Sequence, residues 1–323
     1  MQISATTVRR AVPALCALAV FGAPAAAGAA PATTGLRVEA DNKPLAPGHS
    51  FVTDSVTVVT DTSAACRGSG KPVRLNGPNA LGLVADATDA SRPVRPLQVT
   101  DRFSFGLLVC GIGGYPASDS AFWLYKVNHV SPEVGGDQQP VKSGDQVLWY
   151  FQDTTKGTNI GDELALEAPA RAVADKPFGI TVVSYDFKGA RTPAAGARVL
   201  FRGGSATTGA DGRATISLHG DGYRGLRAVR AAPGGSDIPS APVRVCVGDG
   251  CAPVRGQRIT GRDVSDSVKG TSGRDVIRTR GGNDRVNVRG GRLDRVYCGS
   301  GRDVVRLSRR DRAARDCEVV LRG

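Results

Sequence analysis

The sequence predicts a mainly β protein built from several turn-rich modules, and three observations carry that prediction. The chain has 323 residues, which is too long for one ordinary domain. Aromatic residues make up only 5% of it, while it holds 42 Gly and 19 Pro, a balance that disfavours helical bundles and favours short strands joined by turns. Hydrophobic residues at 41% still allow packed cores, which excludes global disorder.

Residues 1–29 have the pattern of a secretory signal peptide. Arg9 and Arg10 precede an apolar run over residues 11–21, and small residues at 25–29 offer cleavage sites. The run is shorter than the roughly 20 residues that a membrane span needs, and no later stretch is long enough. Cys16 lies inside the run after Leu15, which disfavours lipidation. We expect no membrane span and a secreted protein, extracellular or loosely associated with the cell wall.

The remaining cysteines number six and fall as neighbours in three regions of the chain. An even number of cysteines in an exported protein predicts disulfides. A zinc cluster is the alternative, but no C-x-x-C spacing occurs and the histidines lie far from the cysteines in sequence. The economical pairs are Cys66 with Cys110, Cys246 with Cys251, and Cys298 with Cys317.

Positive charge is concentrated near the C-terminus. The whole chain has a formal net charge of +12, and residues 256–323 hold 17 Lys and Arg against 9 Asp and Glu. A basic segment can bind nucleic acid, anionic lipid or an anionic polymer of the cell envelope. Because an exported protein does not meet nucleic acid, the envelope polymer is the first choice among these three partners, but the charge pattern favours a merely solvated basic surface over any of them.

The first module, residues 36–153, alternates short apolar runs with turns, which predicts an antiparallel sheet. Residues 79–86 have a spacing that predicts one short helix. The aromatic residues Trp123, Tyr125, Trp149 and Tyr150 fit core packing better than an exposed binding surface.

Residues 121–128 and 141–150 of this module resemble the transcobalamin-like C-terminal domain family, which is β-grasp-like. Gly144-Asp145 matches the family's tight turn before its last strand, whereas His129 stands where the family has glycine after the asparagine. The vitamin-binding members hold a corrin mainly through a separate helical barrel, which this chain lacks. The resemblance therefore implies a binding or adhesion role with an unknown ligand, and cobalamin less readily.

The second module, residues 164–247, contains four or more strand-like runs separated by Gly, Pro and Asp, which predicts a β-sandwich. Residues 195–199 and 207–216 are similar to bacterial immunoglobulin-like or carboxypeptidase-regulatory-like domains. In those domains a turn like Asp211-Gly212 joins two strands. Such modules are commonly spacers, and we expect no functional site here.

The third module, residues 256–323, carries a repeat of nine or ten residues. Aspartates recur through it, and each has an aliphatic residue two positions later. The pattern resembles the calcium-binding nonapeptide repeat of hemolysin-type proteins, which forms a parallel β-roll whose Asp side chains coordinate Ca²⁺. The repeat starts at Asp266, and the resemblance implies that the calcium ligands are Asp275, Asp284, Asp294 and Asp303.

A metal-free ladder of Arg and Asp pairs is the alternative for this module. Arg274, Arg285, Arg295 and Arg302 each adjoin a repeat aspartate, and a nearby cation opposes Ca²⁺ binding. Residues 309–318 break the period, so we expect them to cap the stack with the help of Cys317.

No catalytic motif is found in the sequence. It contains no G-x-S-x-G, H-E-x-x-H or phosphate loop, and its three histidines, His49, His129 and His219, lie in unremarkable contexts. A glycan hydrolase that uses paired carboxylates is the remaining enzymatic alternative. We expect a non-enzymatic, secreted binding or surface-associated protein with a Ca²⁺-ordered basic repeat, or with a calcium-independent basic tail that holds it on an anionic polymer.

Overall fold

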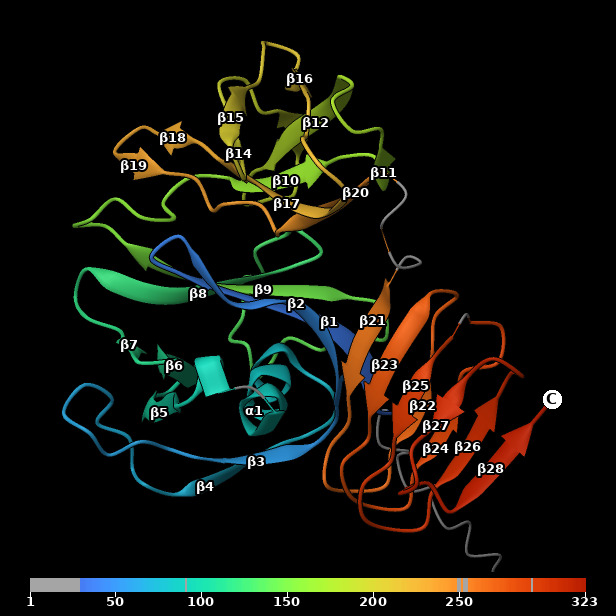
Figure 1. The fold of residues 1–323 in the computed structure, drawn as a ribbon. Helices are drawn as coiled ribbons and strands as arrows, with labels where there is room; N and C mark the ends of the chain where they lie inside the picture. The colour runs from blue at the N-terminus through green and yellow to red at the C-terminus, as the bar shows by residue number, and fades with distance from the viewer. Residues whose placement is uncertain (1–29, 91, 249–250, 252–254, 292) are drawn as a thin grey trace, which may run out of the picture.

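The computed structural model describes residues 30–323 except 91, 249–250, 252–254 and 292, so the expected signal peptide lies outside the described residues. The described chain is mainly β with one α-helix, as the composition predicted. It forms three modules in chain order, a helix-bearing first module, a sandwich and a C-terminal roll (Figure 1).

The first module is built on a mixed sheet that carries the helix on one face. Its elements are β1 (Ala32–Ala40), β2 (Lys43–Thr53), β3 (Val56–Val59), β4 (Pro72–Leu75), α1 (Ala80–Ala90), η1 (Arg92–Val94), β5 (Leu97–Phe103), β6 (Gly106–Ile112), β7 (Tyr115–Pro116), β8 (Ala121–Val127) and β9 (Gln146–Asp153). β1 pairs with β2 antiparallel and with β9 in parallel. The prediction of an antiparallel sheet was therefore wrong for the pair β1 and β9. Parallel pairing is open to β9 because the long crossover from β2 contains α1.

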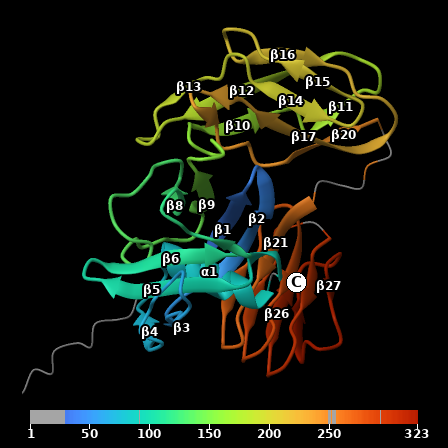
Figure 2. The same cartoon turned by 90° about the vertical axis from the view of Figure 1, so that its left-hand side faces the viewer.

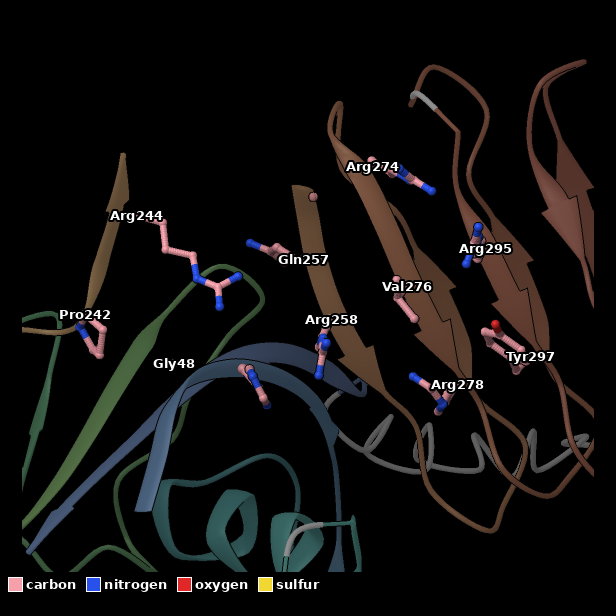
Figure 3. A pocket seen from close by; sticks show the side chains of 12 residues that line it. Gly48, Pro242, Arg244, Gln257, Arg258, Arg274, Val276, Arg278, Arg295 and Tyr297 are labelled. Carbon is pink, nitrogen blue, oxygen red and sulfur yellow. The ribbon is translucent and has the colours of Figure 1, made fainter. Parts of the chain in front are cut away.

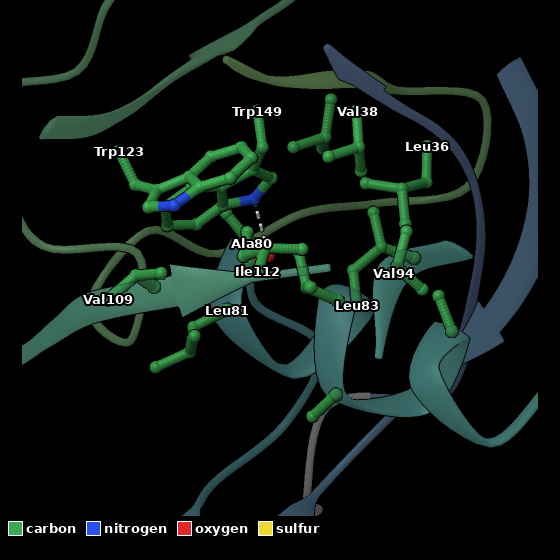
Figure 4. Packing of buried hydrophobic residues seen from close by; sticks show 14 of the residues in the cluster. Leu36, Val38, Ala80, Leu81, Leu83, Val94, Val109, Ile112, Trp123 and Trp149 are labelled. Carbon is green, nitrogen blue, oxygen red and sulfur yellow. Dashed lines mark hydrogen bonds between the residues drawn. The ribbon is translucent and has the colours of Figure 1, made fainter. Parts of the chain in front are cut away.

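The helix follows its N-cap residue, Asn79, and packs into the main core. The Asn79 Oδ1 atom accepts the N–H of Gly82 at 2.7 Å, a helix N-cap. Leu81 and Leu83 are buried beneath the sheet, and the Trp149 indole donates to the Ala80 carbonyl at 3.2 Å (Figure 4). The helix expected at residues 79–86 is therefore present and runs four residues further.

Both faces of β9 are covered, which explains its continuous apolar sequence. Trp149 and Phe151 face the helix, whereas Leu148 and Tyr150 face the sandwich and pack with Ile238. Trp123 is also buried and Tyr125 is half-buried. The core interpretation of these aromatic residues is therefore confirmed.

Two turns next to β8 and β9 follow the expected chemistry. Gly144 has a φ of 96°, and the Asp145 Oδ2 atom accepts the N–H of Lys142 at 2.9 Å. Asn128 and His129 both have positive φ, 49° and 73°, as a type I′ hairpin turn requires. His129 thus takes the glycine conformation, where its ring stacks on Tyr185 with centroids 3.8 Å apart.

The second module is a sandwich of two sheets around one core. Its elements are β10 (Glu163–Glu167), β11 (Arg171–Ala172), β12 (Phe178–Tyr185), β13 (Arg191–Pro193), β14 (Arg198–Phe201), β15 (Gly204–Thr207), β16 (Arg213–Ile216), β17 (Gly222–Val229), β18 (Ala231–Ala232), β19 (Gly235–Ser236) and β20 (Val243–Val247). One sheet has the order β10-β12-β13 with β16 beside β12, and the other has the order β11-β20-β17-β14-β15. The turn at Gly212, with a φ of 72°, leads from β15 in one sheet to β16 in the other.

The third module is a roll of two parallel sheets. Its strands are β21 (Arg255–Thr260), β22 (Ser267–Lys269), β23 (Arg274–Arg278), β24 (Arg285–Asn287), β25 (Arg295–Tyr297), β26 (Val304–Leu307), β27 (Arg312–Ala313) and β28 (Val319–Arg322). Successive strands alternate between the sheets β21-β23-β25-β27 and β22-β24-β26-β28. Residues two repeats apart therefore lie side by side, and the aliphatic residue of each repeat is buried between the sheets, namely Val268, Ile277, Val286, Val296 and Val305.

The C-terminal segment forms the last coil of the roll. β27 lies within residues 309–318 and β28 follows them, and each is the last strand of its sheet, so this end of the stack is built from the same strand pairing as the rest. Asp311 and Glu318 take the place that the repeat aspartates hold in earlier coils, which is why the fold continues after the sequence period ends.

The three disulfides are the predicted ones. Sulfur atoms join Cys66 to Cys110, Cys246 to Cys251, and Cys298 to Cys317. Each bridge closes a segment within one region of the chain, as the sequence spacing indicated.

The modules are not structurally separate, which the sequence did not predict. β21 pairs in parallel with β2 through Ser50 and Phe51, so one sheet runs from β8 through β9, β1 and β2 into the roll. The sandwich covers the other face of the first module's strands (Figure 2). There the Lys126 ammonium donates to the carbonyls of Tyr185 and Asp186 at 3.0 and 2.9 Å.

Candidate anion-binding site

The outer face of the roll strands next to β2 is basic because side chains alternate along each strand. In β23, Asp275 and Ile277 point inward and are fully buried, so Arg274, Val276 and Arg278 face outward. The register places Arg258 of β21 and Arg295 of β25 on either side of Val276. Neighbouring strands lie about 4.8 Å apart, so the backbones of these two arginines are separated by roughly 10 Å.

These side chains line a groove of about 740 Å³ at the junction of the three modules. The first module contributes Gly48 and His49 from β2, and the sandwich contributes Arg244 from β20, which lies across from the roll arginines in Figure 3. Among the described residues, the lining contains five arginines, Arg244, Arg258, Arg274, Arg278 and Arg295, and neither aspartate nor glutamate. We call it the arginine groove.

The arginines of the groove are free to meet an external anion. Among the described residues, none of the five guanidinium groups forms an ion pair with a carboxylate. Arg278 stacks over the Tyr297 ring, with its guanidinium carbon 4.7 Å from the centroid, which orients that side chain. Four of the five, all except Arg274, are exposed.

His49 lines the groove beside Arg258 and is partly desolvated there. Burial and the charge of Arg258 together lower the pKa of the His49 imidazole. The ring is therefore expected to be neutral at pH 7, so it offers a hydrogen bond to a bound anion rather than a further charge.

The fold places the roll's negative charge inside and its positive charge outside. Six of the nine acidic residues in residues 256–323 are buried, Asp266, Asp275, Asp284, Asp294, Asp303 and Asp311. Most of the arginines lie on the outer faces of the sheets or in turns. The surface is thus more basic than the net charge of the segment indicates.

The four aspartates predicted as calcium ligands do not meet at one point. They belong to two ladders. In each ladder, a carboxylate accepts a hydrogen bond from the backbone N–H of the residue at the same position one coil, that is two repeats, earlier in the chain. In the first ladder the order is Gln257, Asp275, Asp294 and Asp311, with hydrogen bonds of 2.7 to 3.0 Å. In the second the order is Asp266, Asp284, Asp303 and Glu318, with hydrogen bonds of 2.8 Å.

One oxygen of several ladder carboxylates accepts no hydrogen bond from the described residues. These are the Oδ2 atoms of Asp284, Asp294 and Asp303, which are buried. Burial, together with neighbouring ladder carboxylates, raises the pKa of Asp284 and of Asp294 to about 6. These oxygens are of the kind that Ca²⁺ prefers, but the described residues contain no cluster of three or more acidic, His or Cys groups around one point.

In the described part of the roll, only one repeat aspartate forms the Arg–Asp pair that the alternative ladder requires. The Arg262 guanidinium donates to Asp266 Oδ1 at 2.7 Å, and the Arg262 N–H donates to Asp266 Oδ2 at 2.7 Å. Arg274 and Arg295, which adjoin Asp275 and Asp294 in sequence, point to the outer face instead. The sequence identified these two arginines as neighbours of aspartates and did not predict the groove. The alternation of side chains along each strand was the signal that they face away from those aspartates.

The remaining histidines lie elsewhere. The Nδ1 atom of His129 is 3.1 Å from the Glu163 carboxylate at the interface of the first module and the sandwich. His219 pairs with Asp175 on the exposed side of the sandwich. The three imidazoles therefore occupy three different environments and do not form a common site.

A comparison with protein-family models matches residues 98–153 to a domain of unknown function (DUF4430). The match covers β5 to β9, the part of the first module for which the sequence resembled transcobalamin-like domains. No curated protein and no solved structure matches the chain. No helix in the described part of the chain is long and apolar enough to cross a membrane.

Proposed function

We propose that this is an exported, non-enzymatic binding protein that is held on an anionic polymer of the cell envelope through the arginine groove. The observation that carries the proposal is the groove's lining of five arginines, with no aspartate or glutamate among the residues that the structure describes there. Guanidinium groups form paired hydrogen bonds with phosphate and carboxylate groups, so a row of them suits a chain of repeated anions.

The shape of the groove favours a polymer over a small anion. Its arginines come from two modules, Arg244 from the sandwich and the others from three roll strands. A single phosphate contacts one or two such groups, whereas a polymer contacts all of them. The expected signal peptide and the three disulfides fit a location outside the cytosol, where nucleic acid is not the available polyanion.

Binding of the mature chain, residues 30–323, to poly(glycerol phosphate) tests this function. The triple variant Arg258→Ser, Arg278→Ser and Arg295→Ser removes three charges from the groove. The matched control, Lys269→Ser, Arg285→Ser and Arg306→Ser, removes three exposed charges from the opposite sheet of the same roll. We expect the groove variant to bind roughly tenfold more weakly or worse, a loss of about 1.4 kcal/mol, and the control to lose much less.

Salt provides the second readout. Because polymer binding releases counterions, the affinity should fall steeply as NaCl rises from about 50 to 200 mM, and less steeply for the groove variant. Equal losses in the two triple variants would mean that only net charge matters, and the groove would then have no role.

A second candidate function is Ca²⁺ binding along the aspartate ladders, and the unpartnered Oδ2 atoms of Asp284, Asp294 and Asp303 favour it. A cation there would satisfy buried oxygens that otherwise lack a partner. Addition of Ca²⁺ to the mature protein should raise the thermal midpoint of the roll, and chelator should reverse it. The variant Asp284→Asn with Asp294→Asn should lose that response, and an unchanged midpoint in the wild-type protein would exclude calcium.

A further inference from the structure

A second hollow lies in the first module, mostly within the residues that match the family of unknown function. It has a volume of about 610 Å³, and it shares no residue with the arginine groove. Strands β5, β6 and β8 and the loop between β3 and β4 form its walls. Ligand sites in proteins typically have volumes of about 300 to 1,000 Å³.

The walls of this hollow are held in place before any ligand arrives. The Cys66–Cys110 disulfide ties the loop after β3 to β6. The Asp61 N–H donates to the Val99 carbonyl at 2.8 Å, and the Ser69 N–H donates to Asp101 Oδ1 at 2.8 Å, so both ends of the loop are fixed to β5. A preformed site avoids the entropy cost of ordering a loop upon binding.

The floor of the hollow exposes apolar side chains that packing does not explain. Phe122 is 41% exposed and Leu108 is 38% exposed. On the same face of β8, Leu124 packs beside the sandwich and Lys126 is buried, whereas Phe122 lies uncovered in the hollow. An exposed aromatic ring in a concave, preformed site offers a flat apolar face to a ligand.

The rim of the hollow carries polar groups of both signs. Arg67, Arg102 and Asp119 are exposed there, and none of them forms an ion pair with a described residue. The Arg102 guanidinium carbon lies 4.5 Å from the centroid of the Phe103 ring, which orients it beside the apolar floor. A purely apolar ligand would cover these groups without hydrogen bonds, and a polyanion would meet the Asp119 carboxylate.

We propose that this hollow binds a neutral glycan made of pyranose units. A pyranose ring has a face of C–H groups and an edge of hydroxyl groups. The face fits on Phe122 and Leu108, and adjacent hydroxyls can pair with the guanidinium of Arg102 and the carboxylate of Asp119. This site is separate from the arginine groove, so the proposal does not depend on polymer retention by the roll.

Calorimetric titration of the mature protein with cellotetraose, maltotetraose and chitotetraose tests the proposal. We expect at least one of these tetrasaccharides to bind with millimolar or tighter affinity, and binding to persist at about 0.5 M NaCl, where charge interactions are screened. The variant Phe122→Ala should weaken binding roughly tenfold or more. The matched control is Phe187→Ala, which removes a ring that is 52% exposed on the sandwich.

Three results would overturn it. These are no saturable binding of any of the tetrasaccharides, equal affinity of Phe122→Ala and the wild-type protein, or loss of binding in about 0.5 M NaCl. Circular dichroism of Phe122→Ala establishes that the variant is folded, and Asp119→Asn gives a second variant whose weaker binding does not depend on the ring. Retention on poly(glycerol phosphate) by the Phe122→Ala variant shows that the two sites fail independently.

Discussion

Glu163 brings a carboxylate into the interface between the first module and the sandwich, where its side chain is only 5% exposed. Arg37, Lys126 and His129 approach it to 3.3, 4.0 and 3.1 Å. Although burial acts to raise the pKa of Glu163, its hydrogen bond with His129 and the neighbouring positive charges hold the pKa below its usual value. Burial also lowers the pKa of Lys126. Each of these buried charges is therefore stabilised by the opposite charges next to it, and removing one leaves the others without compensation.

The variant Glu163→Gln tests how much this set stabilises the protein. Removing one partner of a buried charge group leaves the others uncompensated, so we expect a loss of about 3 kcal/mol in the free energy of unfolding. Urea denaturation measures it. The control Glu167→Gln breaks an exposed pair with Arg191 and should cost less than about 1 kcal/mol. Similar losses in both variants would contradict the role assigned to Glu163.

The ladder aspartates give the roll a pH dependence of defined sign. Because the pKa values of Asp284 and Asp294 are raised to about 6 in the folded chain, their protonated forms are favoured by folding. The stability that they contribute is complete below their unfolded pKa and is lost as the pH rises through about 6.

The metal-free roll should therefore melt at a lower temperature at pH 7 than at pH 5. Thermal melts of the mature protein in chelator, followed by circular dichroism, measure this difference. The double variant Asp284→Asn and Asp294→Asn should reduce this difference, because an amide keeps the acceptor for the backbone N–H but does not titrate. Asp86 of the first module, whose pKa is raised to about 7 by burial, contributes the remainder with the same sign. A midpoint that rises between pH 5 and 7 in chelator would contradict the assigned sign.

Among the elements, the roll strands are unusually short, and several pair over only two or three residues. Such strands have little stability of their own. The burial of aliphatic side chains between the two sheets stabilises these strands. The ladder carboxylates also accept backbone N–H groups at the start of successive strands. The Cys298–Cys317 disulfide closes the last coils.

Removal of that disulfide by Cys298→Ser with Cys317→Ser should destabilise the roll by about 3 kcal/mol, the loop-closure value for a loop of this size. Differential scanning calorimetry should show one transition moved to lower temperature. The control Cys246→Ser with Cys251→Ser opens a bridge with a sequence separation of only 5 and should shift stability less. No shift in the Cys298→Ser, Cys317→Ser variant would show that the last coils do not depend on the bridge.

In the whole molecule, the first module, the sandwich and the roll are joined by buried contacts. The sheet continues from β2 into β21, where Val52 joins the roll's own core. Arg227 of the sandwich donates to Glu39 of β1 at 2.7 Å. The arginine groove exists only because these contacts place β2, β20 and the roll strands around one space.

The roll should therefore be much less ordered when it is separated from the rest of the chain. Residues 256–323 alone lose the pairing of Ile259 with Ser50 and the apolar contact of Val52. We expect the isolated segment to lack the cooperative melting transition that the full chain shows by circular dichroism. A transition at the same temperature as in the full chain would mean that the junction with β2 contributes nothing.

Several features followed directly from local sequence. The spacing of Cys66 and Cys110, and of the other two pairs, was sufficient for the disulfides. The aliphatic residue two positions after each repeat aspartate is buried, as the period required. The turn at Gly144 and Asp145 formed as expected, because its conformation depends on only a few adjacent residues.

The candidate sites depended on contacts that sequence spacing does not contain. Arg244 and Arg295 are far apart in the chain and line one groove, and Phe122 is exposed although its neighbour Trp123 is buried. The resemblance implied calcium ligands at Asp275, Asp284, Asp294 and Asp303, and the structure adds that one oxygen of each accepts a backbone N–H from an earlier coil.

The sequence by itself determined the β class, the disulfide pairs and the buried positions of the roll, because these follow from composition, spacing and strand periodicity. Only the tertiary structure decided that β2 continues into β21, that most acidic residues of the roll are buried, and that arginines from two modules face one groove. The physical reason is that charge balance and pairing between distant strands are settled by which surfaces meet. Which surfaces come into contact depends on how all three cores pack together, and this packing cannot be read from any local segment of the chain.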